Sequence, residues 1–413
     1  MEYVSLGSLT NRKIGYGIVQ PGKNIKHGIP VIKVNNLISG LRNLDDLEKT
    51  SEENDKKYRR TKLSGGELII SVVGTVGKTA IVPKSFVGCN LVRATALIDI
   101  IDPILTAFVK YYIDSPQGKN YILENLNTTV QPTLNIKSLI DMPIPKLDRN
   151  FVIKIVSILS SLDDKIELNR RINANLEEQS QALFKSWFID FEPFKDGKFV
   201  DSELGMIPEG LELKFIKDIP HKIESGRRPK GGATLNGVPS IGAENIKGLG
   251  LYDYSKTKYI PNDFASTTVK GKINGYELLI YKDGGKPGYF IPNYTIFGDG
   301  FPFKEMFINE HVFKLDLFDR GYNAFAYFYM QTPYIMNQLN SIGGKAAIPG
   351  INTKDVESLP IFSGDNKYVQ EFGIKVLLMI KQILHNCKES ARLSALRDTL
   401  LPKLMSGEIE VES

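Results

Sequence analysis

Cysteine, histidine and long apolar runs are scarce in this chain of 413 residues. Its two cysteines, Cys89 and Cys387, and four histidines are too few for a disulfide framework or a series of zinc modules. No apolar run approaches the roughly 18 residues of a membrane helix, and Met1-Glu2-Tyr3 does not begin a secretory signal peptide. We therefore expect a protein of the reducing cytoplasm without a membrane partner.

A strong excess of one charge is also missing. The net charge is +5, and the content of 42% hydrophobic and 24% charged residues is ordinary for a globular protein. So mild an excess permits a polyanionic partner without requiring one. The length allows two to four domains.

Catalytic motifs are lacking as well. Segment 71–79 ends in Gly-Lys-Thr like a phosphate-binding loop, but Val72 stands where its first glycine should be. A predicted strand follows the segment, whereas phosphate binding needs a helix N-terminus. The histidines form no ligand-spaced cluster. We therefore expect a binding protein with no catalytic residue, metal site or cofactor of its own.

What the chain does contain is a copy of part of itself. Residues 107–188 align without a gap onto residues 324–405, at an offset of 217, with 17 of 82 pairs identical. Unrelated segments of ordinary composition share roughly 5. Upstream of residue 107 the offset is predicted to drift between about 209 and 219 because loops differ in length. The repeat indicates a duplicated module of one domain and one helix.

Each copy is predicted to contain β-strands followed by a helix, which gives an α+β fold. The predicted strands of the first copy are 29–34, 67–73 and 94–100, and a helical stretch is predicted to follow at about 106–125. The second copy has predicted strands at 240–246 and 276–281 and a helix at 324–340. Gly74 and Gly77 recur as Gly285 and Gly288 with the same spacing, and we expect tight turns there.

A long helical segment follows each domain and carries an apolar seam with steps of four and three residues. The first seam contains Leu162, Ile166, Asn169, Leu176 and Leu183, and the second contains Met379, Ile383, Asn386, Leu393 and Leu400. A generic helical hairpin inside a bundle has a similar pattern. The asparagine repeated at one seam position favours a dedicated coiled coil, because such residues fix register at a cost in stability.

Four segments result from this organisation. Residues 1–150 and 197–367 are predicted to form the two domains, and residues 151–196 and 368–413 the two helical regions. If the helices pair antiparallel, the domains lie at opposite ends of one spacer with pseudo-two-fold symmetry. Such symmetry suits a target with two separated half-sites, as in paired DNA-reading units.

Basic residues gather in the regions where the two copies differ. Segment 56–62 has five cations in seven residues. Cations beside turns suit phosphate contacts, and amides or cations on variable loops suit base reading. A solvated basic face is the alternative for any single cluster. The candidate DNA contacts are Lys56, Lys57, Tyr58, Arg59, Arg60, Lys62, Lys78, Thr79, Arg227, Arg228, Lys230, Asn245, Lys256, Lys258, Lys282 and Lys286.

Three segments resemble a known family. The end of the chain, LSALRDTLLPKLMSGEI at 393–409, and the central segments LFKSWFIDFEP at 183–193 and SELGMIPEG at 202–210 are similar to signature segments of the specificity (S) subunits of type I restriction–modification systems. The resemblance extends over the full chain, in the order of two target-recognition domains and two helical regions.

The resemblance implies a non-catalytic DNA-binding subunit. Each target-recognition domain would read one half of a bipartite double-stranded DNA site, and two long antiparallel coiled-coil helices would set the gap. Two modification (methyltransferase) subunits and the restriction (endonuclease/translocase) subunits would be partners, and would hold S-adenosylmethionine, ATP and Mg²⁺. Exposed apolar residues are expected to dock the modification subunits, with packing onto the adjoining domain as the alternative: Trp187, Phe188, Leu401 and Leu404.

Other functions stay open at this point. The nearest alternative is an equivalent specificity module of a methylation or defence system that lacks a type I nuclease. A self-contained enzyme is disfavoured by the missing motifs. A coiled-coil adaptor without a DNA role would give no site-selective shift of DNA in a gel.

Overall fold

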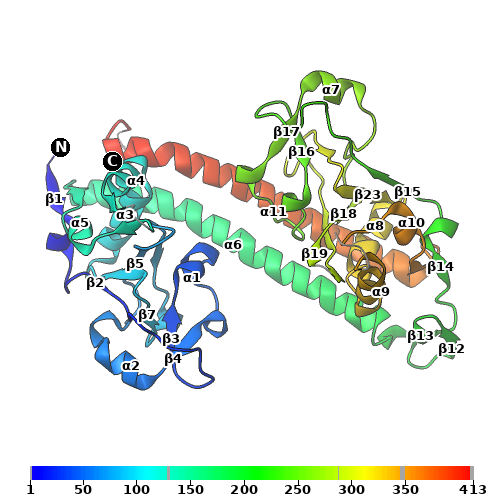
Figure 1. The fold of residues 1–413 in the computed structure, drawn as a ribbon, viewed down its shortest axis with the longest axis horizontal. Coiled ribbons are helices and arrows are strands. Elements are labelled where there is room, and N and C mark those ends of the chain that lie inside the picture. Colours follow the sequence, from blue (N-terminus) through cyan, green and yellow to red (C-terminus); the bar gives the residue numbers. More distant parts are fainter. Residues whose placement is uncertain (1, 128–130, 287, 345–348, 410–413) are drawn as a thin grey trace. The chain divides into compact units, whose positions relative to one another are not determined.

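The computed structural model describes residues 2–127, 131–286, 288–344 and 349–409 (Figure 1). Two compact units divide the chain. One runs from the N-terminus to Asp164 and includes the segment from Ser394 onward, and the other is Lys165–Leu393. Each unit contains one of the predicted domains together with part of each long helix.

The first domain is built on two sheets. Four strands form an antiparallel sheet in the order β2-β8-β5-β6, and three form a sheet β4-β3-β7 in which β3 and β7 are parallel. Its strands are β1 Tyr3–Ser5, β2 Gly15–Tyr16, β3 Ile29–Ile32, β4 Glu48–Thr50, β5 Leu68–Ser71, β6 Thr79–Ile81, β7 Asn90–Leu91, β8 Thr95–Ile98, β9 Leu126–Asn127, β10 Thr133–Leu134 and β11 Pro143–Pro145. Its α-helices are α1 Val34–Ser39, α2 Glu52–Lys57, α3 Pro103–Asp114, α4 Pro116–Glu124 and α5 Ile136–Ile140.

The four-stranded sheet of this domain is covered on both faces. Leu68 and Ile70 of β5 join a core with Phe108 of α3, whereas Ile69 points to the other face and joins Ile32 of β3. Successive side chains of a strand alternate between faces, so a strand buried on both sides needs an unbroken apolar run. This explains why β5 shows no polar alternation in the sequence.

The second domain repeats this plan. Its four-stranded sheet has the order β15-β23-β18-β21, and its three-stranded sheet has the order β17-β16-β22 with β16 and β22 parallel. Its strands are β14 Leu213–Phe215, β15 Lys222–Ser225, β16 Val238–Ile241, β17 Lys258–Ile260, β18 Leu278–Tyr281, β19 Gly285–Lys286, β20 Tyr289–Phe290, β21 Asn293–Ile296, β22 Phe307–Ile308, β23 Val312–Asp316 and β24 Pro360–Phe362. Its α-helices are α7 Asn262–Thr267, α8 Arg320–Tyr329, α9 Pro333–Gly343 and α10 Thr353–Glu357.

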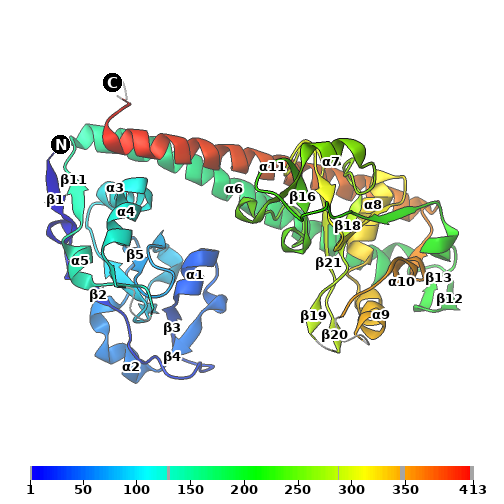
Figure 2. The same cartoon turned by 45° about the horizontal axis from the view of Figure 1, so that its top comes forward.

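Two hairpins distinguish the second unit. The β19–β20 hairpin is inserted between β18 and β21 and lies against α9 (Figure 2). A further hairpin, β12 Phe199–Ser202 with β13 Gly205–Pro208, lies between the end of the first long helix and β14. The insertion changes one loop of the repeated domain and leaves its strand order intact.

Equivalent strands locate the length difference between the copies. The first residues of β3 and β16 differ by 209 (238 − 29), whereas those of β7 and β22 differ by 217 (307 − 90). The drift expected upstream of residue 107 is therefore confirmed, and the constant register begins at β7. The extra residues of the second copy lie upstream of that strand.

The helical stretch predicted at about 106–125 is confirmed and consists of two helices, whereas the single helix predicted at 324–340 is wrong because it is divided into α8 and α9. Ser115 ends α3, and its hydroxyl accepts the N–H of Gly118 to begin α4. Pro116 follows at the first position of α4, where its missing N–H costs nothing. The second copy breaks in the same place, with Pro333 as the first residue of α9.

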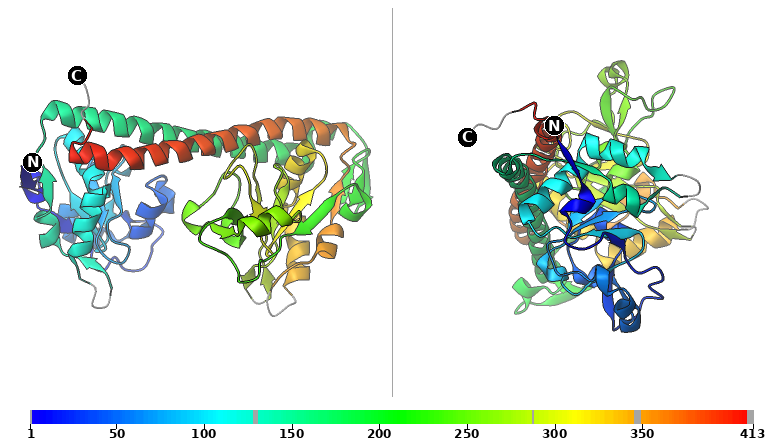
Figure 3. Two further views of the ribbon diagram at one scale, coloured as in Figure 1. Left: turned by 90° about the horizontal axis from the view of Figure 1, so that it is seen from above. Right: turned by 90° about the vertical axis from the view of Figure 1, so that its left-hand side faces the viewer.

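Two long helices complete the fold: α6 Arg149–Phe188 and α11 Lys367–Ser406 (Figure 3). In the second unit Asn169 Nδ2 lies 3.2 Å from Ser390 Oγ, and Ser180 Oγ lies 3.1 Å from Met379 Sδ, so the helices run antiparallel. In the first unit Arg397 pairs with Asp163 at 2.7 Å. Every predicted seam residue is buried or half-buried. The predictions of an α+β fold and of antiparallel seam pairing are confirmed.

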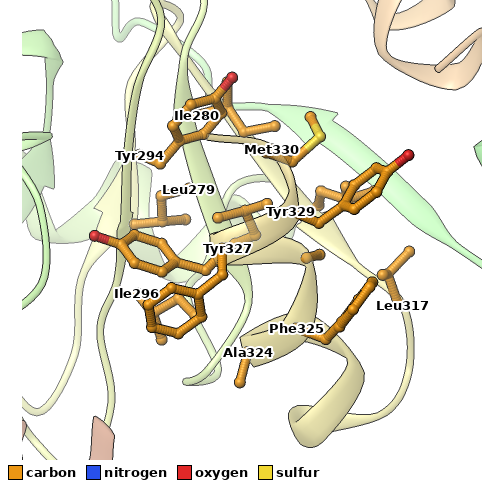
Figure 4. Packing of buried hydrophobic residues seen from close by; sticks show 14 of the residues in the cluster. Leu279, Ile280, Tyr294, Ile296, Leu317, Ala324, Phe325, Tyr327, Tyr329 and Met330 are labelled. Carbon is orange, nitrogen blue, oxygen red and sulfur yellow. The ribbon is translucent and has the colours of Figure 1, made fainter. Parts of the chain in front are cut away.

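The core of the second domain joins α8 to its sheet. Tyr327 of α8 lies near Leu279 of β18 and Ile296 of β21, whereas Phe325 lies on the side of Leu317 (Figure 4). The same core takes in Phe184 and Phe188 at the end of α6. Aromatic side chains bury 150–250 Å² each, so the sheet, α8 and the end of α6 form one packed body.

Candidate nucleic-acid interface

The basic segment 56–62 of the first domain extends from the end of α2 into a 3-10 turn at Arg59–Thr61. Three of its cations are engaged locally, because Lys57 pairs with Glu53, Lys62 with Asp55 and Lys56 with Glu52. The Lys57 ammonium lowers the pKa of the exposed Glu53 carboxyl, chiefly through its hydrogen bond. The segment is therefore less basic than its composition indicates.

Two arginines of this segment remain available. Arg59 and Arg60 are exposed and have no ion pair within the described part of the chain. Tyr58 is half-buried against the small core of Ile18, Val31 and Val92, so it fixes the segment to the domain. Arginines held on an anchored turn suit phosphate contacts.

The glycine-containing turn 71–79 of the first domain is not a phosphate loop. Gly74 and Gly77 have φ values of +77° and +86°, so the predicted tight turn is confirmed. Ser71 Oγ accepts the N–H of Lys78 at 2.8 Å and occupies the turn. Thr79 lies in β6 and donates its hydroxyl hydrogen bond to Asp114 at 2.6 Å, whereas the Lys78 side chain is exposed.

In the second domain four of the candidate cations are already engaged. Arg228 lies 3.7 Å from Glu310, Lys256 3.6 Å from Asp253, and Lys258 2.7 Å from Glu244. Lys282 Nζ lies over the Phe313 ring, 4.9 Å from its centroid. Burial raises the pKa of Glu244, but the Lys258 ammonium and other hydrogen bonds outweigh it, so the pKa lies below its ordinary value.

The remaining candidates of this domain are exposed, with one exception. Arg227, Lys230 and Lys286 are exposed, and Lys286 lies in β19 of the inserted hairpin. Asn245, by contrast, is buried and its Oδ1 accepts the N–H of Gly242 at 3.0 Å. Its prediction as a DNA contact is wrong, because the side chain closes an internal turn. The repeat-equivalent Asn36 accepts the N–H of Lys33 in the same way.

The expectation of exposed docking residues at the helix ends is wrong for three of the four candidates. Phe188 is 3% exposed, Leu404 1%, and Leu401 is also buried. Trp187 is half-buried and meets the Tyr368 ring edge-on, at a centroid distance of 6.1 Å. Each helix end packs onto the domain of its own unit, which was the alternative explanation of these residues.

Other apolar residues of the long helices are exposed instead. Leu168 and Ile172 lie four residues apart on α6, and Ile374 and Leu378 lie four apart on α11, all outside the predicted seam. Residues four apart share one face of a helix. The signal was present in the sequence as a second apolar spacing beside the seam. Leu396 is exposed on α11 in the same way.

No described helix combines the length and apolar character that crossing a bilayer requires. Within the same residues, no group of three or more His, Cys, Asp or Glu side chains is arranged to hold a metal ion.

Comparison with known proteins gives consistent relatives. A family model described as the type I restriction modification DNA specificity domain matches residues 1–178. The type I restriction enzyme MjaIX specificity subunit of Methanocaldococcus jannaschii is 28% identical over 75% of this chain and 71% of its own length. The EcoBI specificity subunit of Escherichia coli is 32% identical over 43% of this chain and 39% of its own length.

A solved structure shares the fold. The type I restriction–modification S subunit from M. genitalium aligns with a TM-score of 0.57 and 15% identity, over 100% of this chain and 96% of that one. The family model covers the first domain and much of α6, and the MjaIX match extends over three quarters of the chain. The chain is thus similar to the type I restriction modification DNA specificity domain over residues 1–178, and to type I restriction enzyme specificity subunits over longer spans.

Proposed function

We propose that this chain is the non-catalytic subunit that gives a type I restriction–modification complex its DNA sequence specificity. Each domain reads one half of a bipartite double-stranded site, and α6 with α11 sets the unread gap. The observation that carries the proposal is one strand order occurring twice with different loops. A common frame with different loops suits two half-sites of different sequence.

The available cations support phosphate binding by both domains. Arg59 and Arg60 in the first domain and Arg227 and Lys230 in the second are exposed. Contacts of this kind give affinity that falls as salt rises, and they position a protein on the duplex. Base reading then comes from other polar side chains on the loops.

The exposed apolar pairs of the long helices support docking of two modification subunits. Leu168 with Ile172, and Ile374 with Leu378, leave apolar surface uncovered on α6 and α11. Exposed apolar patches are typical of protein–protein contacts. In this proposal the restriction subunits join the same assembly, and S-adenosylmethionine, ATP and Mg²⁺ bind to the partners.

A heptad insertion tests the role of the helices. Seven residues are added after Asp164 in α6 and seven after Leu393 in α11, where the two compact units divide. A full heptad preserves the seam and adds about 10 Å of helix, the length of about three base pairs. Sequencing of methylated sites in cells that carry the chain with its modification subunits should show a longer gap and unchanged half-sites.

The control carries the insertion after Asp164 only, which shifts one helix against the other and should abolish assembly. A longer-helix variant with an unchanged gap would contradict the spacer role. If the natural chain, assembled with its modification subunits, gives no site-selective shift of duplex DNA, the whole proposal fails.

A further inference from the structure

The first domain contains an open cleft whose lining combines apolar residues with two cations, Lys33 and Arg93. Its volume is about 510 Å³, and Tyr16, Lys33, Arg93 and Gln131 contribute side chains to it. No aspartate or glutamate is among the described residues that line it. Lysine and arginine side chains only donate hydrogen bonds, so the charged residues of this cleft favour a partner with hydrogen-bond acceptors.

The floor of this cleft is held by strand contacts. Ile18 and Val92 form a parallel bridge, and Val73 and Thr133 form an antiparallel one. The backbone N–H of Arg93 donates to the Ile18 carbonyl at 2.8 Å, which fixes the point from which the arginine side chain extends. Ile18 is fully buried. Side chains on a fixed floor are suited to reading one defined geometry.

Arg93 is the available cation of this cleft. Lys33 pairs with Glu48 at 2.5 Å, whereas Arg93 is exposed and has no ion pair in the described residues. A guanidinium presents a rigid fork of donors and no acceptor. The geometry that satisfies such a fork is a pair of acceptors in one plane, as on guanine O6 and N7.

The second domain places the opposite charge at the same point of the fold. Glu310 lies between β22 and β23 as Arg93 lies between β7 and β8, at the offset of 217. Its carboxylate lies 3.7 Å from both Arg228 Nη1 and His311 Nε2, with its side chain one third exposed. Asp283, equivalent to Val73, pairs with His311 at 2.8 Å. This face of the second domain therefore offers carboxylate acceptors beside Arg228 and His311.

We infer that Arg93 and Glu310 are equivalent base-reading positions of opposite specificity. Arg93 reads a guanine in the half-site of the first domain, and Glu310 accepts from the amino group of a cytosine in the other half-site. Arginine with guanine and carboxylate with cytosine are pairings that major-groove geometry favours. The inference rests on the proposed function, since it names the determinants of that same reading.

Selection of bound duplexes from a randomised pool tests the inference, with the full chain assembled with its modification subunits. Arg93→Gln and Arg93→Lys should each reduce the preference for guanine at one position of one half-site by about tenfold or more. The other half-site should be unchanged. Glu310→Ala should reduce the preference for cytosine at one position of that other half-site. Arg59→Gln is the comparison, because loss of a phosphate contact weakens all sequences alike.

The outcomes separate the inference from the proposed function. If the natural chain selects no bipartite motif, both fail. If it selects one that both Arg93 variants leave intact, or if those variants weaken all sequences equally, only the inference fails. The inference is also overturned if the position at which the Arg93 variants lose base preference is not a guanine. If Arg93→Gln lowers the melting temperature, the result for Arg93→Lys decides whether the inference holds. Lysine keeps the positive charge and removes the forked guanidinium.

Discussion

The two domains contain the same turn, capped by a buried glutamate, but a different cation neutralises that glutamate in each domain. Glu67 in the first domain accepts the N–H groups of Ser64 and Gly65, and Glu277 in the second accepts those of Asn274 and Gly275. Both carboxylates are almost fully buried. A carboxylate that satisfies two backbone N–H groups fixes the turn before β5 or β18 in each copy.

The counter-ion of this glutamate comes from a different place in each domain. Arg12 reaches Glu67 from a loop, at 2.8 Å, with a side chain that is 31% exposed. Lys314 extends from β23 inside the second domain, is 3% exposed, and lies 3.1 Å from Glu224 and 3.5 Å from Glu277. The duplication thus kept the turn and changed the means of neutralising it, so the two domains should respond differently to losing the cation.

The largest difference is expected on removing those cations. Lys314→Met leaves Glu224 and Glu277 without their shared partner in the interior, and should lower the free energy of unfolding by about 3–5 kcal/mol. Arg12→Met should cost less, about 1–3 kcal/mol, because Arg12 is partly solvated and Glu67 keeps the N–H groups of Ser64 and Gly65. Denaturant unfolding of the full chain, followed by signals from each unit, measures both.

Lys314→Met combined with Glu224→Gln and Glu277→Gln is the matched control, since it removes the uncompensated charge and should recover part of the loss. Equal costs for Lys314→Met and Arg12→Met would show that burial of the cation does not distinguish the domains.

A smaller effect, common to both domains, is expected at two glycines that occupy equivalent positions in the two copies of the repeat. A Cβ on Gly226 would lie 1.7 Å from the Ile308 carbonyl oxygen, and one on Gly17 would lie 2.1 Å from that of Leu91. Backbone atoms cannot move aside as a side chain can. Gly226→Ala and Gly17→Ala should therefore each cost about 3 kcal/mol, measured as a fall in melting temperature.

Gly15→Ala is the control in the first domain, because the nearest atom to its Cβ, the Lys13 carbonyl oxygen, lies at 3.9 Å. A small change for Gly15→Ala with a large one for Gly17→Ala would locate the constraint at the bridge to β7. Similar falls in melting temperature for Gly15→Ala and Gly17→Ala would show that the close backbone contact of Gly17 is not a constraint that the two domains share.

The smallest effect is expected at the repeated seam asparagines. Asn169 Nδ2 donates to Glu389 at 2.8 Å, but its buried Oδ1 finds no hydrogen-bond donor within the described chain. Both amide atoms of Asn386 are satisfied, because it donates to Asn173 at 2.8 Å and accepts from Gln382. Asn386→Leu should lower the free energy of unfolding by about 1 kcal/mol, and Asn169→Leu should cost less. Chemical denaturation of both variants measures this, and a larger cost for Asn169→Leu would contradict it.

Local patterns were predicted well from the sequence. The antiparallel seam, the strands at β3, β5 and β8, and the turn at Gly74 and Gly77 depend on periodicity or on glycine at positive φ. The break between α3 and α4 was missed although Ser115 and Pro116 are a capping signal in the sequence. The strand at which the constant register starts, β7, follows from strand pairing, which short apolar runs do not specify.

The surface assignments fared worse, for a physical reason. Phe188, Leu401 and Leu404 lie outside the seam, and the sequence does not state that each helix end packs onto a domain. Asn245 has a side chain suited to base reading, but it lies behind Gly242 in a buried turn. Arg93 was not a candidate because no cluster of charge marks it in the sequence.

The sequence by itself determined the duplication, the α+β class and the seam, because each follows from residues close along the chain. The tertiary structure decided which charges are neutralised and which apolar side chains are covered. Lys314 meets Glu224 from another strand, and Phe188 meets Phe325 from another helix. Burial and ion pairing depend on segments that only folding brings together, and the roles of single side chains depend on both.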